Sequence, residues 1–523
     1  MNPADRTVVP SPGRPVPART ARGGRRGGLA RRLALVAALT GLLAGIAIGV
    51  PGASPTAAAA APTIVSLTFD DGNADQLAAL PVLSRYGMHG TFYVISGSVG
   101  APGYLTRADL ATIAADGHEI GGHTVSHPDL TGVPADEAAR QICDDRVTLA
   151  GWGFRPTSFA YPYAAYTTAT EAAVAGCGYN SARALGDLAS AHGCTGCDLA
   201  SPVPPPDPYA LEAVDEIDTS WTLAQLEQVV TRAEVAGGWV PFTFHHLCAG
   251  CDSLSISPAT FADFLAWLAL RPATTTVRTV DQVVGGTYRT PVPGPPASGS
   301  TAVVNASLET AGAPDFPQCW FPGGYGTNTA TWTRTTDAHS GGFAERLDLT
   351  GYGSGDAKLL PVFDLGSCSP AVTAGHTYRV TASYRSTAVT QFAAYYRDAA
   401  GAWFYWTSSP WFAASSAWSG ADWTTPPVPA GATGLSFGLN LFTDGSLTTD
   451  DYAIADTAAS APAPARVAAA LAPSAASSAV TPVSRPGASG RHAHRRAWDR
   501  HARPFLPGRL RPGQRVAIPV LPD

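Results

Sequence analysis

The stretch Thr63–Gly72, TIVSLTFDDG, joins an apolar run to two adjacent carboxylates and a glycine. Ile64–Phe69 is rich in β-branched and apolar residues and predicts a buried strand. Asp70 and Asp71 follow at its end, where successive side chains point in different directions, so one can bind a metal while the other faces a substrate. Taken alone, the same letters are more typical of an Asp-Asp-Gly turn.

Outward from this strand, apolar runs alternate with helical patterns as far as about Gly286. Such alternation predicts parallel strands with helical crossovers, and hence an α/β fold with an open sheet or a barrel. In either form, functional groups gather at the carboxyl ends of the strands. The predicted strands are Ile64–Phe69, Gly90–Ile95, Ser158–Ala160, Tyr179–Ala182 and Trp239–Phe244, and the predicted helices are Gln76–Tyr86, Asp109–Ala115, Ala135–Ala150, Leu223–Ala236 and Thr260–Leu270.

Residues 118–127, HEIGGHTVSH, contain a second group of metal-ligand types. His123 and His127 are four residues apart, a helical or turn-like step that lets both imidazoles reach one cation. The pattern differs from that of zincins, because Thr124 stands where the glutamate base would follow the first histidine. With Asp71, these histidines predict a two-histidine, one-carboxylate site with open positions for water and substrate.

Together these residues resemble the NodB-homology domain of polysaccharide deacetylases, carbohydrate esterase family four, over about residues 62–286. The resemblance implies a distorted, incomplete (β/α) barrel with a groove at the carboxyl ends of its strands. It implies that Asp71, His123 and His127 bind a divalent metal, zinc or another transition ion such as cobalt. It also implies that Asp70 is the general base.

The family's third motif, Arg-Pro-Pro-Tyr-Gly, is altered in this chain. The nearest run is Phe159–Ala164, FAYPYA, so Ala160 stands at the arginine position and Ala164 at the glycine position. Some relatives carry this Phe-Ala-Tyr-Pro form. The departure raises the question of how Asp70 is held. Arg183, at the end of the next predicted strand, is the candidate to replace the missing arginine, near the oxyanion and the substrate. The alternative is that Arg183 forms a purely structural ion pair.

The last motif ends a predicted strand with His245, at a position that resembles the family's Leu-Leu-His. By this resemblance His245 is the general acid and Asp215 is its carboxylate partner, with Asp218 as the alternative partner. Tyr163 is the family-guided donor of a backbone N–H group to the oxyanion. These groups fit the hydrolysis of an amide or an ester.

A linker over residues 289–300 marks a domain boundary, because its run PVPGPPASGS is rich in Pro, Gly and Ser. The catalytic domain is therefore expected over residues 62–288. Beyond the linker the apolar period changes to two, for example at Tyr378, Val380 and Ala382. This period predicts an all-β sandwich over residues 301–456.

The predicted sandwich contains seven of the twelve tryptophans of the chain. Some must fill its core, but the run Trp403-Phe404-Tyr405-Trp406 places aromatic rings on both faces of one strand. Because exposed flat rings stack on pyranose rings, the domain is similar in architecture and composition to a carbohydrate-binding module. Trp403 and Trp406 are the candidate contacts, and a domain that only packs or spaces is the alternative.

Residues 1–61 carry eight arginines up to Arg32, then the apolar segment Leu33–Val50 and the small residues Ala57–Ala61. This order predicts a secretory signal with an Ala-x-Ala-like cleavage site, and a retained signal anchor is the alternative. At the other end, residues 457–523 are rich in Ala, Pro and Ser and then in Arg and His. That composition predicts a disordered tail.

All eight cysteines follow the predicted leader, and an even count in an exported chain predicts disulfides. We expect Cys143 to bond to Cys177 and Cys319 to Cys368, each pair within one domain. The two Cys-x-x-Cys pairs would bond locally or to each other, and a four-cysteine zinc site is the alternative. These pairs are Cys194 with Cys197 and Cys248 with Cys251.

Between Pro62 and Asp456, 37 acidic residues outnumber 16 basic ones. Such a surface repels nucleic acid and anionic membranes, so a neutral or cationic polymer is the easier partner. We expect a secreted, monomeric, metal-dependent hydrolase, without a stable membrane span after cleavage. Its expected substrates are the N-acetyl or O-acetyl groups of chitin, peptidoglycan, poly-N-acetylglucosamine or xylan. A catalytically impaired glycan-binding protein, and a small-molecule amide hydrolase or deaminase on the same fold, are the alternatives.

Overall fold

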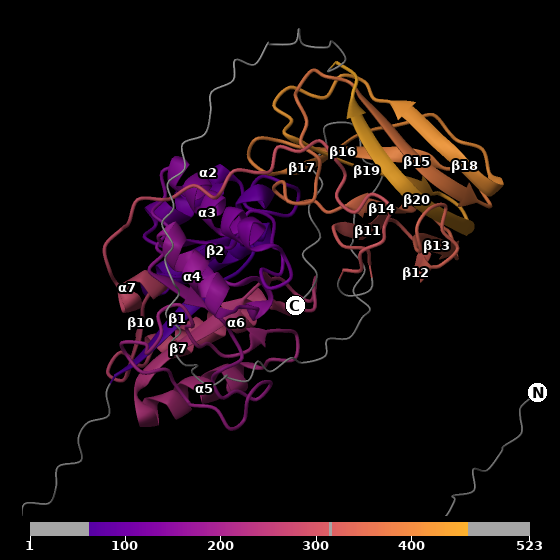
Figure 1. Cartoon of the computed structure of the whole chain (residues 1–523). Coiled ribbons are helices and arrows are strands. Elements are labelled where there is room, and N and C mark those ends of the chain that lie inside the picture. The colour runs from indigo at the N-terminus through magenta and orange to yellow at the C-terminus, as the bar shows by residue number, and fades with distance from the viewer. Residues whose placement is uncertain (1–61, 313–315, 459–523) are drawn as a thin grey trace, which may run out of the picture. The chain divides into compact units, whose positions relative to one another are not determined.

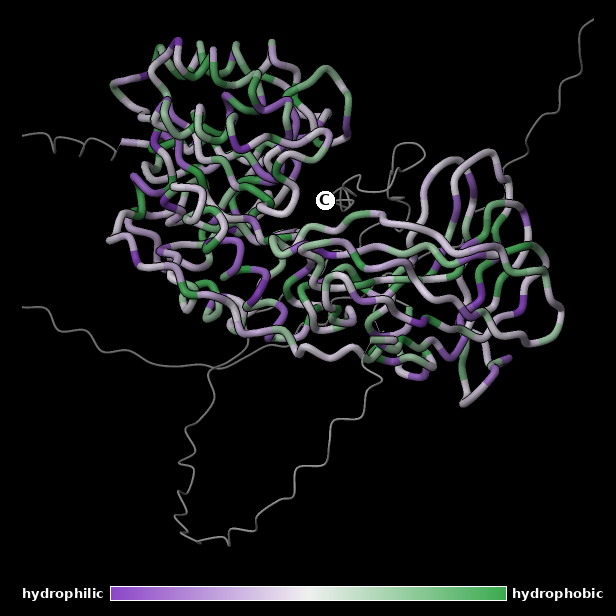
Figure 2. The backbone as a smooth tube through the Cα atoms, turned by 90° about the horizontal axis from the view of Figure 1, so that it is seen from above, coloured by the Kyte–Doolittle hydropathy of each residue, from purple (hydrophilic) through white to green (hydrophobic). Residues whose placement is uncertain are grey.

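The computed structural model describes residues 62–312 and 316–458, which form a parallel α/β domain and a β-sandwich (Figure 1). The predicted leader and nearly all of the predicted tail lie outside these residues. Along the described backbone, hydrophobic stretches are short and interleaved with hydrophilic ones (Figure 2). Within the same ranges, no helix is long and apolar enough to cross a membrane.

The first domain is built on one parallel sheet with strand order β5-β4-β3-β2-β1-β7-β6, and β10 also pairs with β1. No pairing joins the two edge strands β5 and β6 among the described residues, so the barrel is incomplete. This confirms the predicted fold class. The strands are β1 (Thr63–Phe69), β2 (Thr91–Val94), β3 (Glu119–Gly122), β4 (Ser158–Ala160), β5 (Ser181–Arg183), β6 (Glu216–Ile217), β7 (Gly238–Phe244) and β10 (Thr275–Val277).

Helices connect these strands, because parallel neighbours need crossover connections. All five predicted helices are present, although the first divides into a 3-10 turn and an α-helix. Helices α4 and α7 and strands β3 and β10 were not predicted. The helical elements are η1 (Ala74–Ala79), α1 (Leu80–Tyr86), η2 (Ser96–Ser98), α2 (Arg107–Ala115), α3 (Ala135–Gly151), η3 (Pro162–Ala164), α4 (Thr168–Cys177), α5 (Leu223–Ala236), α6 (Pro258–Ala269) and α7 (Val280–Val284).

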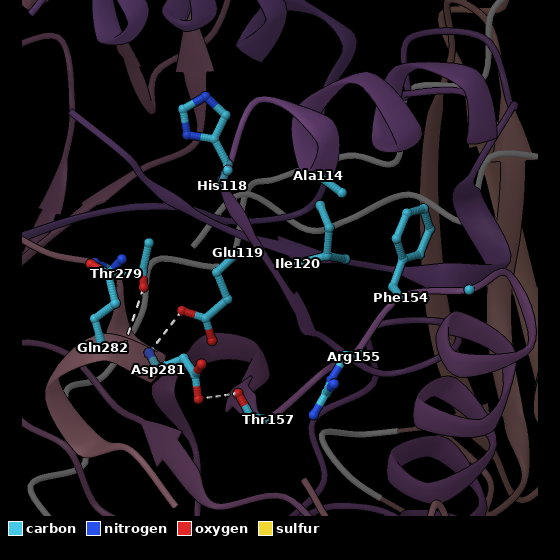
Figure 3. Close-up of a pocket in the computed structure, with 12 residues that line it drawn as sticks. Ala114, His118, Glu119, Ile120, Phe154, Arg155, Thr157, Thr279, Asp281 and Gln282 are labelled. Atoms are coloured by element: carbon cyan, nitrogen blue, oxygen red, sulfur yellow. Dashed lines mark hydrogen bonds between the residues drawn. The ribbon is translucent and has the colours of Figure 1, made fainter. Parts of the chain in front are cut away.

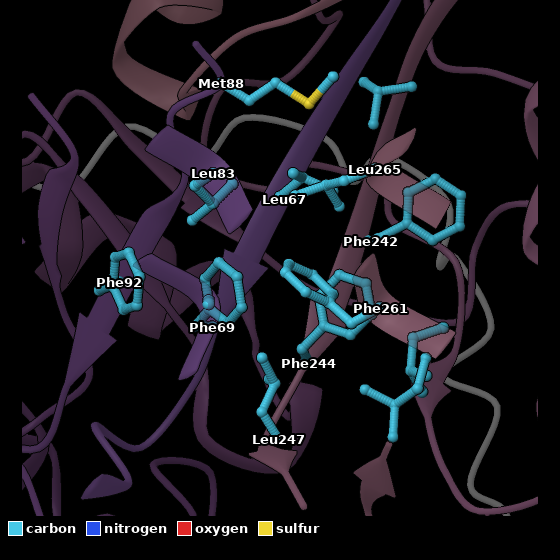
Figure 4. Packing of buried hydrophobic residues seen from close by; sticks show 14 of the residues in the cluster. Leu67, Phe69, Leu83, Met88, Phe92, Phe242, Phe244, Leu247, Phe261 and Leu265 are labelled. Carbon is cyan, nitrogen blue, oxygen red and sulfur yellow. The ribbon is translucent and has the colours of Figure 1, made fainter. Parts of the chain in front are cut away.

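The apolar core beside β1 and β7 places the two strand ends that carry the site (Figure 4). Phe69 stacks on Phe92 with 4.5 Å between ring centroids, and its ring lies 5.6 Å from that of Phe244. Each of these fully buried rings contributes about 1.5–3 kcal/mol. Phe69 and Phe244 are also register partners, so the residues that follow them, Asp70 and His245, leave neighbouring strands side by side.

The second domain consists of two five-stranded antiparallel sheets around a shared core. The predicted alternation holds, since Tyr378, Val380 and Ala382 of β15 are buried in that core. One sheet contains β11 (Trp320–Tyr325), β14 (Asp356–Pro361), β19 (Gly434–Leu441), β16 (Gln391–Arg397) and β17 (Trp403–Ser408), and the other contains β12 (Thr329–Thr335), β13 (Ala344–Thr350), β20 (Gly445–Asp456), β15 (Tyr378–Ser386) and β18 (Ser415–Thr424).

All eight cysteines form disulfides, and the two predicted long-range pairs are confirmed. Each Cys-x-x-Cys pair closes on itself. The four-cysteine zinc alternative is therefore wrong. Cys248 and Cys251 close the loop between two short paired strands, β8 (His246–Leu247) and β9 (Ser255–Ile256).

Candidate metal centre

Asp71, His123 and His127 meet at the carboxyl ends of β1 and β3. The Nε2 atoms of the two histidines are 3.0 Å apart. Asp71 Oδ1 lies 3.4 Å from His123 Nε2 and 3.6 Å from His127 Nε2. Ligand atoms about 2.0–2.2 Å from a tetrahedral ion lie about 3.3–3.6 Å from one another. The donor set and its spacing therefore fit one divalent transition metal, and all three residues are buried.

The backbone around this centre adopts conformations that side chains usually avoid. Five of the nine non-glycine residues with positive φ in the described ranges lie here. Such conformations cost of order 1–3 kcal/mol each and gather at functional sites. They are Asp71 at 72°, Thr124 at 69°, His127 at 57°, Tyr163 at 56° and Ala164 at 49°.

His123 is oriented by the strand next to its own. Its Nδ1 lies 2.8 Å from the carbonyl oxygen of Ala160 on β4. A carbonyl only accepts, so Nδ1 carries the proton and Nε2 presents its lone pair to Asp71 and His127. The altered third motif thus still orients a metal ligand through its backbone.

The charges around Asp71 favour its ionised form. Burial of the carboxyl opposes ionisation, but the contact with His123 and the electrostatic influence of His127 and His245 outweigh burial and hold the pKa of Asp71 below its ordinary value. Asp71 is therefore available as an anionic ligand.

Arg183 pairs with Asp70, as the sequence suggested for the missing motif arginine. Its Nη2 donates to Asp70 Oδ2, and both side chains are buried. Arg183 on β5 is the register partner of Ala160 on β4. The guanidinium therefore comes from the neighbouring strand, directly beside the motif position where the family has its arginine. The ring of Tyr93 lies under the guanidinium at 5.3 Å. Arg183 thereby supplies the cation that the altered motif lacks, and it holds Asp70 beside Asp71.

His245 follows β7 and is 2% exposed. Asp215 directly precedes β6, the strand that pairs with β7, and glycines pack against its carboxylate. A Cβ at Gly193 would lie 1.8 Å from Asp215 Oδ2, so a larger residue there would displace this carboxylate. Asp218 instead accepts hydrogen bonds from the backbone and hydroxyl of Ser220, which argues against its role as the partner of His245.

Tyr163 lies against the metal ligands, with its ring centroid 4.7 Å from that of His127. It sits in the turn η3 directly after β4 and has positive φ. The motif's Pro-Tyr step is therefore retained at the site even though its arginine and glycine are not. The proposed donation of its backbone N–H to an oxyanion stays a prediction.

Sequence reasoning missed one polar residue of the site. The amide of Gln76, in η1, contacts the backbone of both Asp70 and His245. Gln76 follows the Asp-Asp-Gly turn at the start of a predicted helix, and no pattern distinguishes it there. Its partner His245 is 169 residues away in the sequence.

The prediction of exposed stacking rings at Trp403 and Trp406 is wrong. Trp403 is 1% exposed and Trp406 is 8% exposed. Trp406 packs in the shared core, whereas Trp403 is covered on the outer face by Phe363, whose ring stacks on it at 4.8 Å. Trp411 is 53% exposed, whereas the other tryptophans that the structure describes are half-buried or buried.

A cavity of about 350 Å³ lies at the opposite end of β3 from the metal ligands (Figure 3). Glu119, at the amino end of this strand, lines it together with His118 and Arg155. The carboxylate of Glu119 accepts hydrogen bonds from Thr91, Ser158 and the backbone of Asp281. Both oxygens of Glu119 therefore have hydrogen-bond donors. The cavity lies at the amino end of β3, whereas the metal ligands lie at the carboxyl ends of β1 and β3, so the cavity is separate from the metal centre.

Residues 58–182 match the sequence model of the family described as polysaccharide deacetylase. This range includes the first two motifs and ends one residue before Arg183. The first domain is thus similar to polysaccharide deacetylases.

Two curated relatives match part of this domain. The chain is 32% identical over 104 residues to peptidoglycan-N-acetylglucosamine deacetylase PgdA of Listeria monocytogenes, which covers 19% of this chain and 22% of that protein. It is 34% identical over 107 residues to a chitin deacetylase of Arthroderma benhamiae, which covers 20% of this chain and 28% of that protein. The matches span less than a third of either relative.

One solved structure is also similar to part of the chain. The Xyl-CE4 domain of a multidomain xylanase from the hindgut metagenome of Trinervitermes trinervoides is 18% identical, with a TM-score of 0.31. The match covers 44% of this chain and 94% of that domain.

Proposed function

We propose that the chain is a metal-dependent polysaccharide deacetylase that removes acetyl groups from an extracellular or cell-wall glycan. The observation that carries this proposal is the joint presence of a two-histidine, one-carboxylate cluster and a second carboxylate, Asp70, held by Arg183 beside it. His245 completes the set from the neighbouring strand end. The family match supports the same chemistry.

Asp71, His123 and His127 would hold the metal ion. A divalent ion bound there polarises an acyl oxygen and lowers the pKa of adjacent water. Asp70 accepts the proton of the attacking water while the water oxygen bonds to the acetyl carbon. The backbone N–H of Tyr163 stabilises the negative charge that develops on the carbonyl oxygen.

The nitrogen must be protonated before the carbon–nitrogen bond breaks, because an amide anion is a poor leaving group. His245 donates that proton, and the products are acetate and a free amine. Asp215 favours the protonated imidazole of His245 as its carboxylate partner. For an O-acetyl group the same proton goes to the departing alkoxide.

A polymeric, extracellular substrate is the favoured class. The predicted secretory leader and the excess of acidic over basic residues in the two domains support a neutral or cationic partner outside the cell. The names of the two curated relatives refer to peptidoglycan and chitin. The β-sandwich would hold the glycan near the site as a carbohydrate-binding domain.

The contact between Arg183 and Asp70 disfavours the alternative of an impaired, glycan-binding protein. That alternative rests on the altered third motif, in which Ala160 replaces the arginine. Arg183 supplies the cation from the next strand, so the loss at Ala160 is compensated at the same level of the sheet.

The test is acetate release by the purified protein from chitin oligosaccharides, peptidoglycan, poly-N-acetylglucosamine and acetylated xylan. Activity should disappear after chelation and return with zinc or cobalt. Acetate release from small acetamides alone, with none from any of the four polymers, would favour the small-molecule amidase and end the polysaccharide proposal.

A further inference from the structure

The ladder between β1 and β7 ends at the two residues that the proposed reaction uses. Register pairs run from Thr63 with Gly238 to Phe69 with Phe244. One more backbone bond follows, from Asp70 N to the carbonyl of Phe244 at 2.9 Å. Asp71 then turns into the left-handed region, with φ of 72°, and the ladder stops.

Beyond the last backbone hydrogen bond of the ladder, the side chain of Gln76 connects the two strand ends. Its Nε2 lies 2.5 Å from the carbonyl oxygen of Asp70 and 2.8 Å from that of His245. One amide NH₂ group has two hydrogens, which match these two acceptors, and the amide oxygen could not face two carbonyls. The side chain is 0% exposed, so water does not compete for these bonds.

The oxygen of the Gln76 amide, in contrast, lowers the stability of the fold. Gln76 Oε1 is buried and accepts no hydrogen bond from any described residue. An unpaired buried acceptor destabilises a fold, and an apolar side chain of the same length would avoid it. Packing alone is therefore a poor reason for glutamine here, whereas the double donation is a specific one.

Neighbouring side chains reinforce the same connection. Asn73 Nδ2 donates to the carbonyl of His245 at 3.3 Å. Asp75 accepts from the backbone of Leu247 and pairs with His246 Nδ1 at 2.7 Å. The segment 73–76 thus fastens the end of β7 to the turn that carries the two aspartates.

We propose that Gln76 is a positioning residue that fixes the general base Asp70 relative to the general acid His245, an inference that rests on the proposed function. The amide holds the backbone of both residues, so their side chains meet the acetyl group from fixed positions. Small losses of alignment between such groups slow a reaction strongly. Gln76 itself touches no reacting atom.

This role predicts a difference between two substrates. Hydrolysis of an N-acetyl group needs both the base and the acid, because the amine leaves only with a proton. Hydrolysis of para-nitrophenyl acetate needs no acid, since the phenolate departs unprotonated. Loss of the alignment between Asp70 and His245 should therefore slow the amide reaction more than the ester reaction.

The experiment compares Gln76→Met with the wild-type holoenzyme on an N-acetyl chitooligosaccharide and on para-nitrophenyl acetate. The kcat for the amide should fall by about tenfold or more, with KM changed by less than about twofold. The kcat for the ester should fall by less than about threefold, and the zinc content should be unchanged.

The control is Ser66→Ala on β1, the strand that directly precedes Asp70. Ser66 accepts a buried hydrogen bond from Trp239 Nε1 at 2.9 Å and donates a partly buried one to the carbonyl of Arg278 at 2.7 Å, and neither bond involves a residue of the site. This variant weakens the β1–β7 pair without touching Asp70 or His245. It should leave the ratio of amide to ester turnover unchanged.

An unchanged ratio in Gln76→Met, from an active wild type, would overturn the inference and leave the proposed function standing. Failure of the wild type to hydrolyse any N-acetyl group would overturn both. If Gln76→Met does not fold, Gln76→Glu keeps the shape and replaces the donors by acceptors. It must then show the same selective loss on the amide, and wild-type amide turnover in it would overturn the inference.

Discussion

At the residue scale, the two adjacent aspartates have different partners and should respond differently to substitution. Asp71 Oδ1 faces both histidines, whereas Asp70 pairs with Arg183. His123→Ala removes one of three ligands and should abolish tight zinc binding, because two ligands seldom hold the ion. Asp70→Asn should keep one zinc per chain and lose at least about a hundredfold in kcat. Metal analysis of both variants with kinetics checks this, and full zinc occupancy in His123→Ala contradicts the ligand assignment.

Arg183 should matter for both stability and turnover. Arg183→Met leaves Asp70 buried without its cation, which costs about 3–5 kcal/mol in comparable buried pairs. We also expect a fall of about a hundredfold in kcat, because the base loses its fixed position. Arg155→Met is the control, since Arg155 is exposed and stacks on Tyr288 at 4.9 Å away from the metal centre. Wild-type turnover by Arg183→Met would mean that this ion pair is structural only.

Glu345 in the sandwich should make stability depend on pH. Its carboxylate is buried, neither oxygen has a hydrogen-bond partner among the described residues, and burial raises its pKa to about 7. Between its ordinary pKa and about 7 the folded protein keeps a proton that the unfolded chain has released, so stability falls as pH rises through this window. Glu345→Gln removes the effect. In the presence of chelator, its melting temperature should match the wild type near pH 4.5 and exceed it by roughly 5 °C at pH 8. Equal curves at both pH values would exclude this role.

The candidate site was largely predictable because its chemistry is local in the sequence. Asp70 and Asp71 share one strand end, and His123 and His127 are four apart, so each pair signals a site by itself. Gln76 was not predictable, since its role depends on a contact with a distant strand. The prediction for the two tryptophans was wrong for a related reason. Alternation shows which residues share a face of a strand, but the sequence around Trp403 does not show that Phe363 covers its ring.

At the element scale, strands and helices with strong apolar periods were predicted to within a few residues. Strand β3 was missed because its sequence, EIGG, contains two glycines, which usually weaken a strand. Helix α4 was missed because small residues give it little amphipathic pattern. In β3 the glycines have a steric reason, since a Cβ at Gly122 would lie 2.0 Å from Tyr179 Oη and 2.5 Å from Asp145 Oδ2.

Gly122→Ala should therefore destabilise the domain by about 1–3 kcal/mol and weaken zinc binding, because the displaced strand carries His123 as its next residue. Gly176→Ala is the control within α4, where no atom of the described residues lies within 4 Å of the added methyl group. It should stabilise by about 0.5–1 kcal/mol. Thermal denaturation with zinc titration measures both effects, and a neutral Gly122→Ala would show that Tyr179 can move aside.

At the scale of the whole molecule, the candidate catalytic groups all precede the linker. The last of them is His245, and the chain continues through α7 before the Pro-rich run. The first part of that run contacts the catalytic domain, with Gly294 N donating to Asp144 at 2.8 Å and Arg140 Nη1 donating to the carbonyl of Pro296 at 3.2 Å. A truncation from Ser298 onward keeps these contacts, so the catalytic domain should fold with its site intact.

This truncation should leave turnover on short soluble oligosaccharides nearly unchanged and reduce turnover on insoluble polymer. The sandwich would contribute local concentration, which matters only when the substrate is fixed in a solid. With Trp403 and Trp406 buried, the exposed Trp411 becomes the ring to test, and Trp411→Ala in the full chain should weaken retention on the polymer. Pull-down of the isolated sandwich on chitin, peptidoglycan and xylan, alongside kinetics of the truncated enzyme, measures both effects. An equal loss on soluble and insoluble substrates would instead mean that the sandwich stabilises the catalytic domain, because a domain that only concentrates the enzyme on a solid cannot affect a dissolved substrate.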